Sequence, residues 1–250
     1  MYADDTVLFF ADKDNSVIQS VLTVELERLN VWLIENKLFL NKEKTESVLF
    51  GTSANLSNVT NYQLSISEHP LKQVTEYRYL GVILNANLSW NAHIESIAVK
   101  VGKRIGMLRR LRRNITMNAA ETVFKSFIRP LMEYCDSVWT CCGEQNKERL
   151  EKLQRRAART ITRFVRSDDA MNSLRWGTLE TRRDMHVFKL VNKCITGKSP
   201  QFFNNYFIFN RDILSRSTRQ SNKLHLPKVR TECAKNSFYY HGCKVFNKFK

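Results

Sequence analysis

The 250 residues lack the sequence features that mark membrane, secreted and repeat proteins. No apolar run approaches the roughly 18 to 20 residues that a membrane-spanning helix needs. No basic segment leads the apolar stretch near the start, so the pattern of a signal peptide is missing as well. Internal repeats, low-complexity tracts and Gly/Ser-rich linkers are also lacking. We therefore expect a globular chain, with 43% hydrophobic and 26% charged residues, whose separate units pack together.

The cysteines form no Cys-x-x-Cys pair. They are Cys135, Cys141, Cys142, Cys194, Cys233 and Cys243. Without a secretory signal, we expect reduced thiols in an intracellular protein. The group Cys233, His241 and Cys243 could hold a metal, but its spacing matches no established zinc pattern. Buried or idle thiols are the simpler interpretation.

Acidic residues are scarce in the second part of the chain. Residues 1–100 hold 8 Lys and Arg against 12 Asp and Glu, whereas residues 101–250 hold 32 against 12. The net charge is therefore −4 in the first part and +20 in the second. Such asymmetry indicates that the second part meets a polyanion. Nucleic acid is the first candidate, and an anionic membrane surface is the alternative.

The apolar periodicity predicts an α+β fold in which strands are concentrated before about residue 92. Strands are expected at 7–10, 45–50, 63–67 and 77–84, with a helix at 16–36. Helices are expected from about 92, at 118–139 with a disturbance near Pro130, at 146–166 and at 178–195. No element after Pro200 has a strong signal.

Two predicted helices carry arginine-rich faces. Residues 103–113 contain six basic residues and no acid. The candidates for phosphate contact are Arg109, Arg110, Arg112, Arg113, Arg155, Arg156, Arg159 and Arg163. In the helix at 146–166 an apolar stripe, which includes Phe164, leaves the arginines mostly on the opposite side. A solvated helix face is the simpler interpretation, but acidic residues at i,i+4 are too few to neutralise the arginines.

Adjacent carboxylates lie near the start of the chain, in the segment YADD (2–5). Asp4 and Asp5 would repel each other at a turn unless a cation lies between them. Mg²⁺ prefers carboxylate oxygens together with substrate phosphates. The pair therefore suggests a magnesium site, and solvated acids at a turn are the simpler alternative.

Several segments, in order along the chain, resemble the reverse transcriptases of non-LTR (LINE-type) retrotransposons. The matching segments are YADD (2–5), NKEKTESVLF (41–50), YRYLGVILNANLSWNAHI (77–94), RPLMEYCDSVW (129–139), LEKLQRRAARTITR (150–163), LRWGTLETRRDMHVFKLVNKCITGKSP (174–200) and the region 218–247. Ordered matches at compatible spacing are far more specific than YADD by itself.

The resemblance implies a division of the chain into three parts. Residues 1–92 would be the C-terminal part of the polymerase palm, 93–168 a basic helical thumb, and 169–250 a helical and irregular tail. The implied partners are an RNA template and a DNA primer, or an RNA–DNA duplex, with dNTP in the intact parent protein. The implied location is the nucleus.

The same resemblance assigns roles to residues. Asp4 and Asp5 fall on the catalytic metal-binding pair, with Mg²⁺ as the implied cofactor. Lys44 falls where the family has a lysine near the departing pyrophosphate, and a surface lysine in a charged turn is the equal alternative.

A second assignment concerns a hairpin. Tyr79, Leu80 and Gly81 fall in a segment that resembles a primer grip, in which Gly81 would allow close backbone approach. A buried strand with a bulge is the alternative.

In this family the third catalytic carboxylate and the template-contacting fingers come from segments before YADD. We therefore expect the chain to be a fragment of an RNA-directed DNA polymerase that is inactive in nucleotidyl transfer alone. A non-catalytic, basic nucleic-acid-binding module and a non-functional retrotransposon relic are the alternatives.

Overall fold

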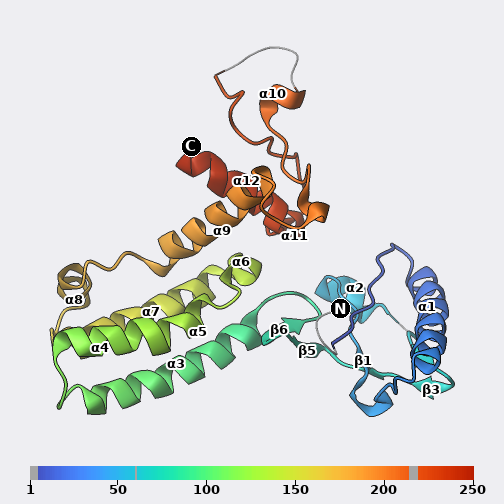
Figure 1. Ribbon diagram of the computed structural model, residues 1–250, viewed down its shortest axis with the longest axis horizontal. Coiled ribbons are helices and arrows are strands. Elements are labelled where there is room, and N and C mark those ends of the chain that lie inside the picture. Colours follow the sequence, from blue (N-terminus) through green and yellow to red (C-terminus); the bar gives the residue numbers. More distant parts are fainter. Residues whose placement is uncertain (1–4, 60, 214–218) are drawn as a thin grey trace. The chain divides into compact units, whose positions relative to one another are not determined.

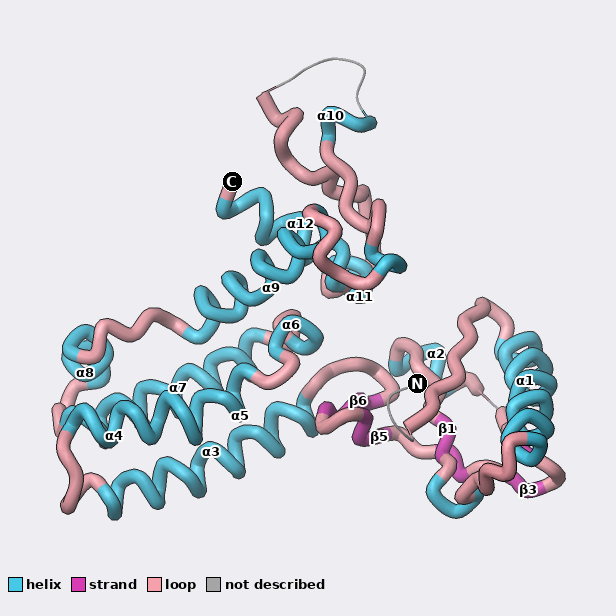
Figure 2. The backbone as a smooth tube through the Cα atoms, in the orientation of Figure 1, coloured by secondary structure: helices cyan, strands magenta, loops and turns pink. Residues whose placement is uncertain are grey.

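The computed structural model describes residues 5–59, 61–213 and 219–250, and the chain forms two compact units with their boundary between Trp90 and Asn91 (Figure 1). The first unit mixes short strands with helices, and the second is built of helices and loops (Figure 2). This composition is consistent with the predicted α+β class. The assignment of palm, thumb and tail to parts of the chain stays a prediction.

The first unit contains one long helix among its described residues. Its elements are α1 (Asn15–Glu35), η1 (Lys42–Lys44), β1 (Glu46–Ser47), α2 (Ser53–Ser57), β2 (Ser65–Ile66), β3 (His69–Pro70), β4 (Lys72–Gln73), β5 (Glu76–Tyr79) and β6 (Val82–Asn85). The side chain of Asp14 caps α1 by accepting a hydrogen bond from the Ser16 backbone N–H at 2.9 Å. The helix predicted at 16–36 is thus confirmed.

The strands of the first unit form three small two-stranded sheets. The strands β1 and β4 pair in parallel, whereas β2 with β3 and β5 with β6 pair antiparallel. The sequence predicted a strand at 45–50, but only Glu46–Ser47 pairs. Strand length depends on the partner that is present, and β4 offers only two residues.

The strand predicted at 7–10 is wrong. Val7, Leu8, Phe9 and Phe10 are not in a strand, and all four side chains are exposed, that of Phe9 to 87%. An apolar run becomes a strand only where a neighbouring strand supplies hydrogen bonds, and no strand of the described residues pairs with this segment.

A small hydrophobic core holds the first unit together. Ile18 and Leu26 from α1 are buried against Leu64, Ile66 and Leu71, which flank the β2–β3 turn. The face of α1 that points away from this core remains apolar, since Val24 and Val31 are about half exposed. The apolar stripe of α1 is therefore only partly covered within the unit.

The second unit is organised around two long helices, α3 and α7, which pack along each other. Its elements are α3 (Asn91–Leu111), α4 (Met117–Val123), η2 (Phe124–Ile128), α5 (Arg129–Glu133), α6 (Asp136–Trp139), α7 (Glu144–Thr162), α8 (Ser167–Ser173), α9 (Leu179–Ile195), η3 (Gln201–Phe203), α10 (Asn210–Ile213), α11 (Glu232–Lys235) and α12 (Phe238–Phe249). The helices predicted from about 92 and at 178–195 are confirmed by α3 and α9.

The helix predicted at 118–139 is interrupted twice. A π-helical turn at Phe124–Ile128 precedes Pro130, which lacks the N–H that a continuous α-helix would use. The chain then breaks at Cys135, whose φ of 50° is left-handed, before α6 resumes. The disturbance near Pro130 is thus confirmed.

The last helix, α12, was not predicted from the sequence. It packs on α9 and buries Cys243, Val245 and Phe246. A Cβ atom added at Gly242 would lie 2.9 Å from the Cγ2 atom of Val191 on α9, so the two helices approach closely there. The 3.6-residue spacing was present, but aromatic and polar residues obscured it.

The metal alternative raised by Cys233, His241 and Cys243 gains no support from the described residues. Cys233 is exposed and Cys243 is buried. Burial raises the pKa of the Cys243 thiol to about 12 and lowers the pKa of His241. In the described parts of the chain no three His, Cys, Asp or Glu side chains are grouped to hold a metal ion.

The described residues also contain no helix long and apolar enough to cross a membrane.

Candidate nucleic-acid interface

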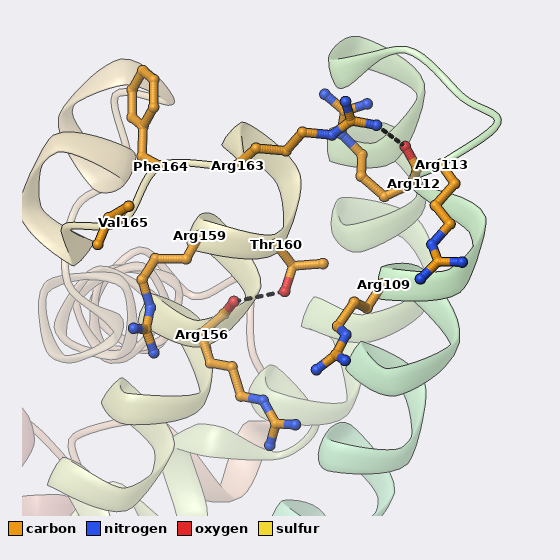
Figure 3. A pocket seen from close by; sticks show the side chains of 9 residues that line it. All are labelled: Arg109, Arg112, Arg113, Arg156, Arg159, Thr160, Arg163, Phe164 and Val165. Atoms are coloured by element: carbon orange, nitrogen blue, oxygen red, sulfur yellow. Dashed lines mark hydrogen bonds between the residues drawn. The ribbon is translucent and has the colours of Figure 1, made fainter.

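An arginine-lined groove of about 480 Å³ lies between the C-terminal parts of α3 and α7 (Figure 3). Its lining residues are Arg109, Arg112, Arg113, Arg156, Arg159, Thr160, Arg163, Phe164 and Val165. Six of these nine are arginines, and no acid is among them. All lie within the second unit.

The apolar pattern of the two helices places these arginines together. Ile105 and Leu108 of α3 are buried, as are Ala157 and Ile161 of α7, where the helices pack. Arginines at intervening positions must then lie beside the helix–helix contact, toward solvent. The groove forms because both helices carry arginines near and just beyond their C-terminal ends.

Arg112 braces the ends of both helices. Its Nε donates a hydrogen bond to the carbonyl of Ile161 at 2.7 Å, and its Nη1 donates to the carbonyl of Ile115 at 2.8 Å. In return, Arg163 donates from Nη2 to the carbonyl of Arg112 at 2.9 Å. The last carbonyls of a helix lack partners within the helix and favour cations. These two arginines therefore have structural roles.

The end of α7 explains why the groove has an apolar edge. The helix predicted to reach residue 166 ends at Thr162, because Arg163 takes a left-handed conformation with φ of 63°. Phe164 then leaves the apolar stripe predicted for it and is 46% exposed, while Val165 is 89% exposed. The prediction that Phe164 continues the apolar stripe of this helix was wrong, and the cause is the left-handed helix end.

Four arginines of the groove have no protein partner among the residues that the structure describes. The side chains of Arg109, Arg113, Arg156 and Arg159 make no hydrogen bond, ion pair or ring contact there. Figure 3 shows Arg109 and Arg156 extending into the space between the helices. Like charges gathered in this way repel one another, and a bound polyanion would remove that cost.

The cations in the N-terminal half of α7, in contrast, are paired with acids. Arg149 pairs with Glu95, Lys152 with Glu148 at 3.8 Å, and Lys147 with Glu144 at 2.7 Å. The sequence already shows the reason, because the acids of α7 end at Glu151. Only the C-terminal half of the helix therefore presents unneutralised charge.

The sequence predicted eight arginines as phosphate contacts, and six of them line the groove. Arg110 is exposed on α3 and Arg155 is half-buried on α7, but neither lines it. Thr160, Phe164 and Val165 were not predicted as site residues. Their only signal was position, since they follow the arginines on α7.

The candidate catalytic residues of the first unit are not gathered in this way. Asp4 lies outside the described residues. Asp5 is exposed, and Lys44 is exposed at the end of the η1 turn, where its backbone N–H donates to Asn41 Oδ1 at 3.1 Å. Within the described residues no ion pair joins Asp5 to Lys44. No group of described carboxylates surrounds Asp5 in the way that magnesium ligands would. The magnesium site stays a prediction.

Tyr79, Leu80 and Gly81 lie at the tip of a hairpin. The sequence predicted a single strand at 77–84, but β5 and β6 pair antiparallel, with Tyr79 opposite Val82. Leu80 and Gly81 form the two-residue turn, with φ of 45° and 84°. Positive φ at both positions is the turn geometry that fits strand twist, and glycine accepts it more readily than leucine. The tip is exposed.

Comparison with curated proteins finds relatives among the polymerases of mobile elements. The chain is 27% identical over 192 residues to the probable RNA-directed DNA polymerase from transposon BS of Drosophila melanogaster, covering 74% of this chain and 21% of that protein. It is 22% identical over 233 residues to the corresponding X-element protein of the same species, covering 86% of this chain and 25% of the relative.

A third relative comes from another species. The Retrovirus-related Pol polyprotein from type-1 retrotransposable element R1 2 of Nasonia vitripennis is 25% identical over 143 residues, covering 55% of this chain and 35% of that protein. The chain thus spans about a fifth to a third of the length of these relatives. No family model and no solved structure matches it.

Proposed function

Because the chain is homologous to the RNA-directed DNA polymerases of non-LTR retrotransposons, we propose that it is part of such a polymerase and that its second unit binds nucleic acid. The bound species would be the RNA template and DNA primer, or their duplex. The groove between α3 and α7 would hold the phosphate backbone. The observation that carries the proposal is the set of four unpaired arginines in the groove.

Arginine suits this role chemically. Its planar guanidinium donates two parallel hydrogen bonds to a phosphate and stays charged at every physiological pH. Arg109 and Arg113 come from α3, while Arg156 and Arg159 come from α7. Cations on both sides of a groove can contact successive phosphates of one strand. Contacts to phosphates carry no base information, so little sequence preference is expected.

The test compares two pairs of charge removals on the same helix. Arg156→Gln with Arg159→Gln removes two cations of the groove, and Arg149→Gln with Lys152→Gln removes two that are paired with acids. Fluorescence anisotropy with an RNA–DNA duplex at several salt concentrations gives the affinity and its salt dependence. If four arginines contact phosphates, the log–log slope should be about −4.

The two variants should behave differently although they lose the same charge. The groove variant should bind all sequences more weakly and lose about two units of salt slope. The paired variant should retain nearly the parent slope. Equal effects of both variants would mean that general positive charge, and not the groove, attracts the duplex. Salt-independent binding, or no binding at low salt, would refute the proposed function.

Catalysis by the chain alone is a separate expectation. We expect no templated nucleotide incorporation by these 250 residues alone, since they cover only about a fifth to a third of the length of their polymerase relatives. Primer extension on poly(A)/oligo(dT) with Mg²⁺ or Mn²⁺ measures this. Extension that is abolished by Asp4→Asn would contradict it and would make Asp4 a catalytic residue.

A further inference from the structure

Phe164 is an exposed aromatic residue that the folding of the second unit leaves unused. It lines the groove beside the arginines and is 46% exposed. Within the described residues no other ring contacts it, and no cation lies over its face. Phe127 is exposed to a similar extent, 47%, but the guanidinium of Arg104 lies over its ring at 3.9 Å. One exposed ring is thus occupied, and the other is available.

We propose that the groove binds an unpaired stretch of nucleic acid, with one base stacked on Phe164 and the adjoining phosphates held by the arginines. This inference rests on the proposed function and names the structural class of the ligand. The ligand would be a single strand, or a single-stranded overhang next to a duplex. A continuous, blunt duplex would bind through phosphates only.

The combination of groups in the groove carries this inference. An aromatic face gains stacking energy only from a base whose own face is open, and bases inside a duplex are covered by their neighbours. Sites for single strands combine a positively charged groove with an aromatic platform. Here Arg156, Arg159 and Phe164 follow one another along α7 and its end, so both parts occur within one helical segment.

The geometry at the end of α7 keeps the ring out of the core. Arg163 turns the chain by its left-handed conformation and is held by its hydrogen bond to the carbonyl of Arg112. The backbone N–H of Phe164 donates to Thr162 Oγ1 at 3.2 Å, which fixes the start of the segment. The ring is therefore held at the edge of the groove by the same contacts that end the helix.

The experiment measures anisotropy for three labelled ligands of one sequence: a single strand, a blunt duplex and a duplex with an overhang. Phe164→Leu removes the aromatic face and keeps an apolar side chain, whereas Phe164→Trp keeps and enlarges the face. Phe127→Leu is the matched control, since its ring has a similar exposure but is covered by Arg104. Circular dichroism confirms that each variant keeps its helices.

Phe164→Leu should weaken binding of the single strand and the overhang by about fivefold or more, because stacking on an aromatic side chain contributes at least that much per base. Binding of the blunt duplex should change by less than about twofold. Phe164→Trp should bind the single strand at least as tightly as the parent chain. Phe127→Leu should bind all three ligands as the parent chain does.

Other outcomes separate this inference from the proposed function. Equal binding of single strand and duplex, with no effect of Phe164→Leu, would overturn the stacking proposal and leave phosphate binding in place. No binding of any nucleic acid would overturn both. Binding to anionic phospholipid vesicles that is lost with Phe164→Leu, together with an unaffected single strand, would assign the ring to a membrane surface and also overturn the inference.

Discussion

The two units differ in how far their local sequence determines where functional side chains lie. In the second unit six of eight predicted arginines line one groove, whereas in the first unit no described His, Cys, Asp or Glu side chains are grouped around Asp5. A long helix fixes which side chains share a face by its 3.6-residue period. Short strands depend on partners far away in the sequence, which the local pattern does not contain.

The same difference applies to stability. The second unit has helices of 17 to 21 residues, α3, α7 and α9, and α7 packs against both of the others. The first unit has sheets of two strands, each strand only two to four residues long. Isolated two-stranded sheets are marginal in water unless other elements cover them. Local opening should therefore cost less in the first unit.

Hydrogen exchange should show the largest difference between the units. Amides in the middle of α3 and α7 should exchange more slowly than those of β5 and β6, by about a hundredfold or more, because the hairpin can open without unfolding a larger core. Amides at Val7–Phe10 should exchange fastest, since this exposed segment is not in a strand. Mass spectrometry of peptides from the intact chain measures both. Uniform protection across the two units would contradict this view.

A smaller effect is expected from the brace at the end of the long helices. Arg112→Gln removes the donors that reach the carbonyls of Ile161 and Ile115, and half-buried carbonyls without partners destabilise the fold. The free energy of unfolding of the second unit should fall by about 2 kcal/mol. Urea denaturation followed by helical circular dichroism measures this loss.

The control for Arg112 lies two residues away. Arg110 is exposed and makes no side-chain hydrogen bond or ion pair with the described part of the chain. Arg110→Gln should change stability by less than about 0.5 kcal/mol. If both substitutions cost the same, the hydrogen bonds of Arg112 would not be the source of the loss, and its assignment as a structural arginine would fail.

Much of the second unit could be predicted from the sequence, and less of the first. In the second unit the periodicity located α3 and α9, as well as the break near Pro130, whereas in the first unit it located α1 but not the extent of the strands. It did not locate the end of α7, because no glycine or proline marks it and Arg163 adopts the left-handed conformation instead. The exposure of Phe164 follows from that end, so the apolar edge of the groove was not predictable either.

Packing between elements was also beyond the local pattern. The local sequence around Gly242 gives no reason for a glycine at this position. The close packing of α12 against α9 supplies that reason, because a side chain there would meet Val191. Likewise, the exposure of Val7–Phe10 depends on which strands pair, and not on the apolar character of the segment. The local sequence therefore predicts least well the environment of those residues whose contacts come from distant parts of the chain.

Glycine-to-alanine substitutions at three positions test how closely each site is packed. They should give the smallest changes in the free energy of unfolding. Gly106 on α3 has no atom within 4 Å of an added Cβ, so Gly106→Ala should stabilise the second unit by up to about 1 kcal/mol through helix propensity. Gly51 in the first unit would place its Cβ 3.4 Å from Leu56, which is ordinary contact. Gly51→Ala should be nearly neutral.

Gly242→Ala should have the opposite sign to Gly106→Ala. The added methyl would lie 2.9 Å from Val191 Cγ2 and 3.2 Å from the ring of Phe207, so these buried side chains or the backbone of α12 must shift. We expect a net loss of about 1 kcal/mol, because overpacking outweighs the gain in helix propensity. Thermal or urea unfolding measures the sign directly. Val191→Ala in the same chain should recover part of the loss, since the two sites are in contact and therefore couple. Additive losses in the double variant would show that the helices do not approach as closely as the structure indicates.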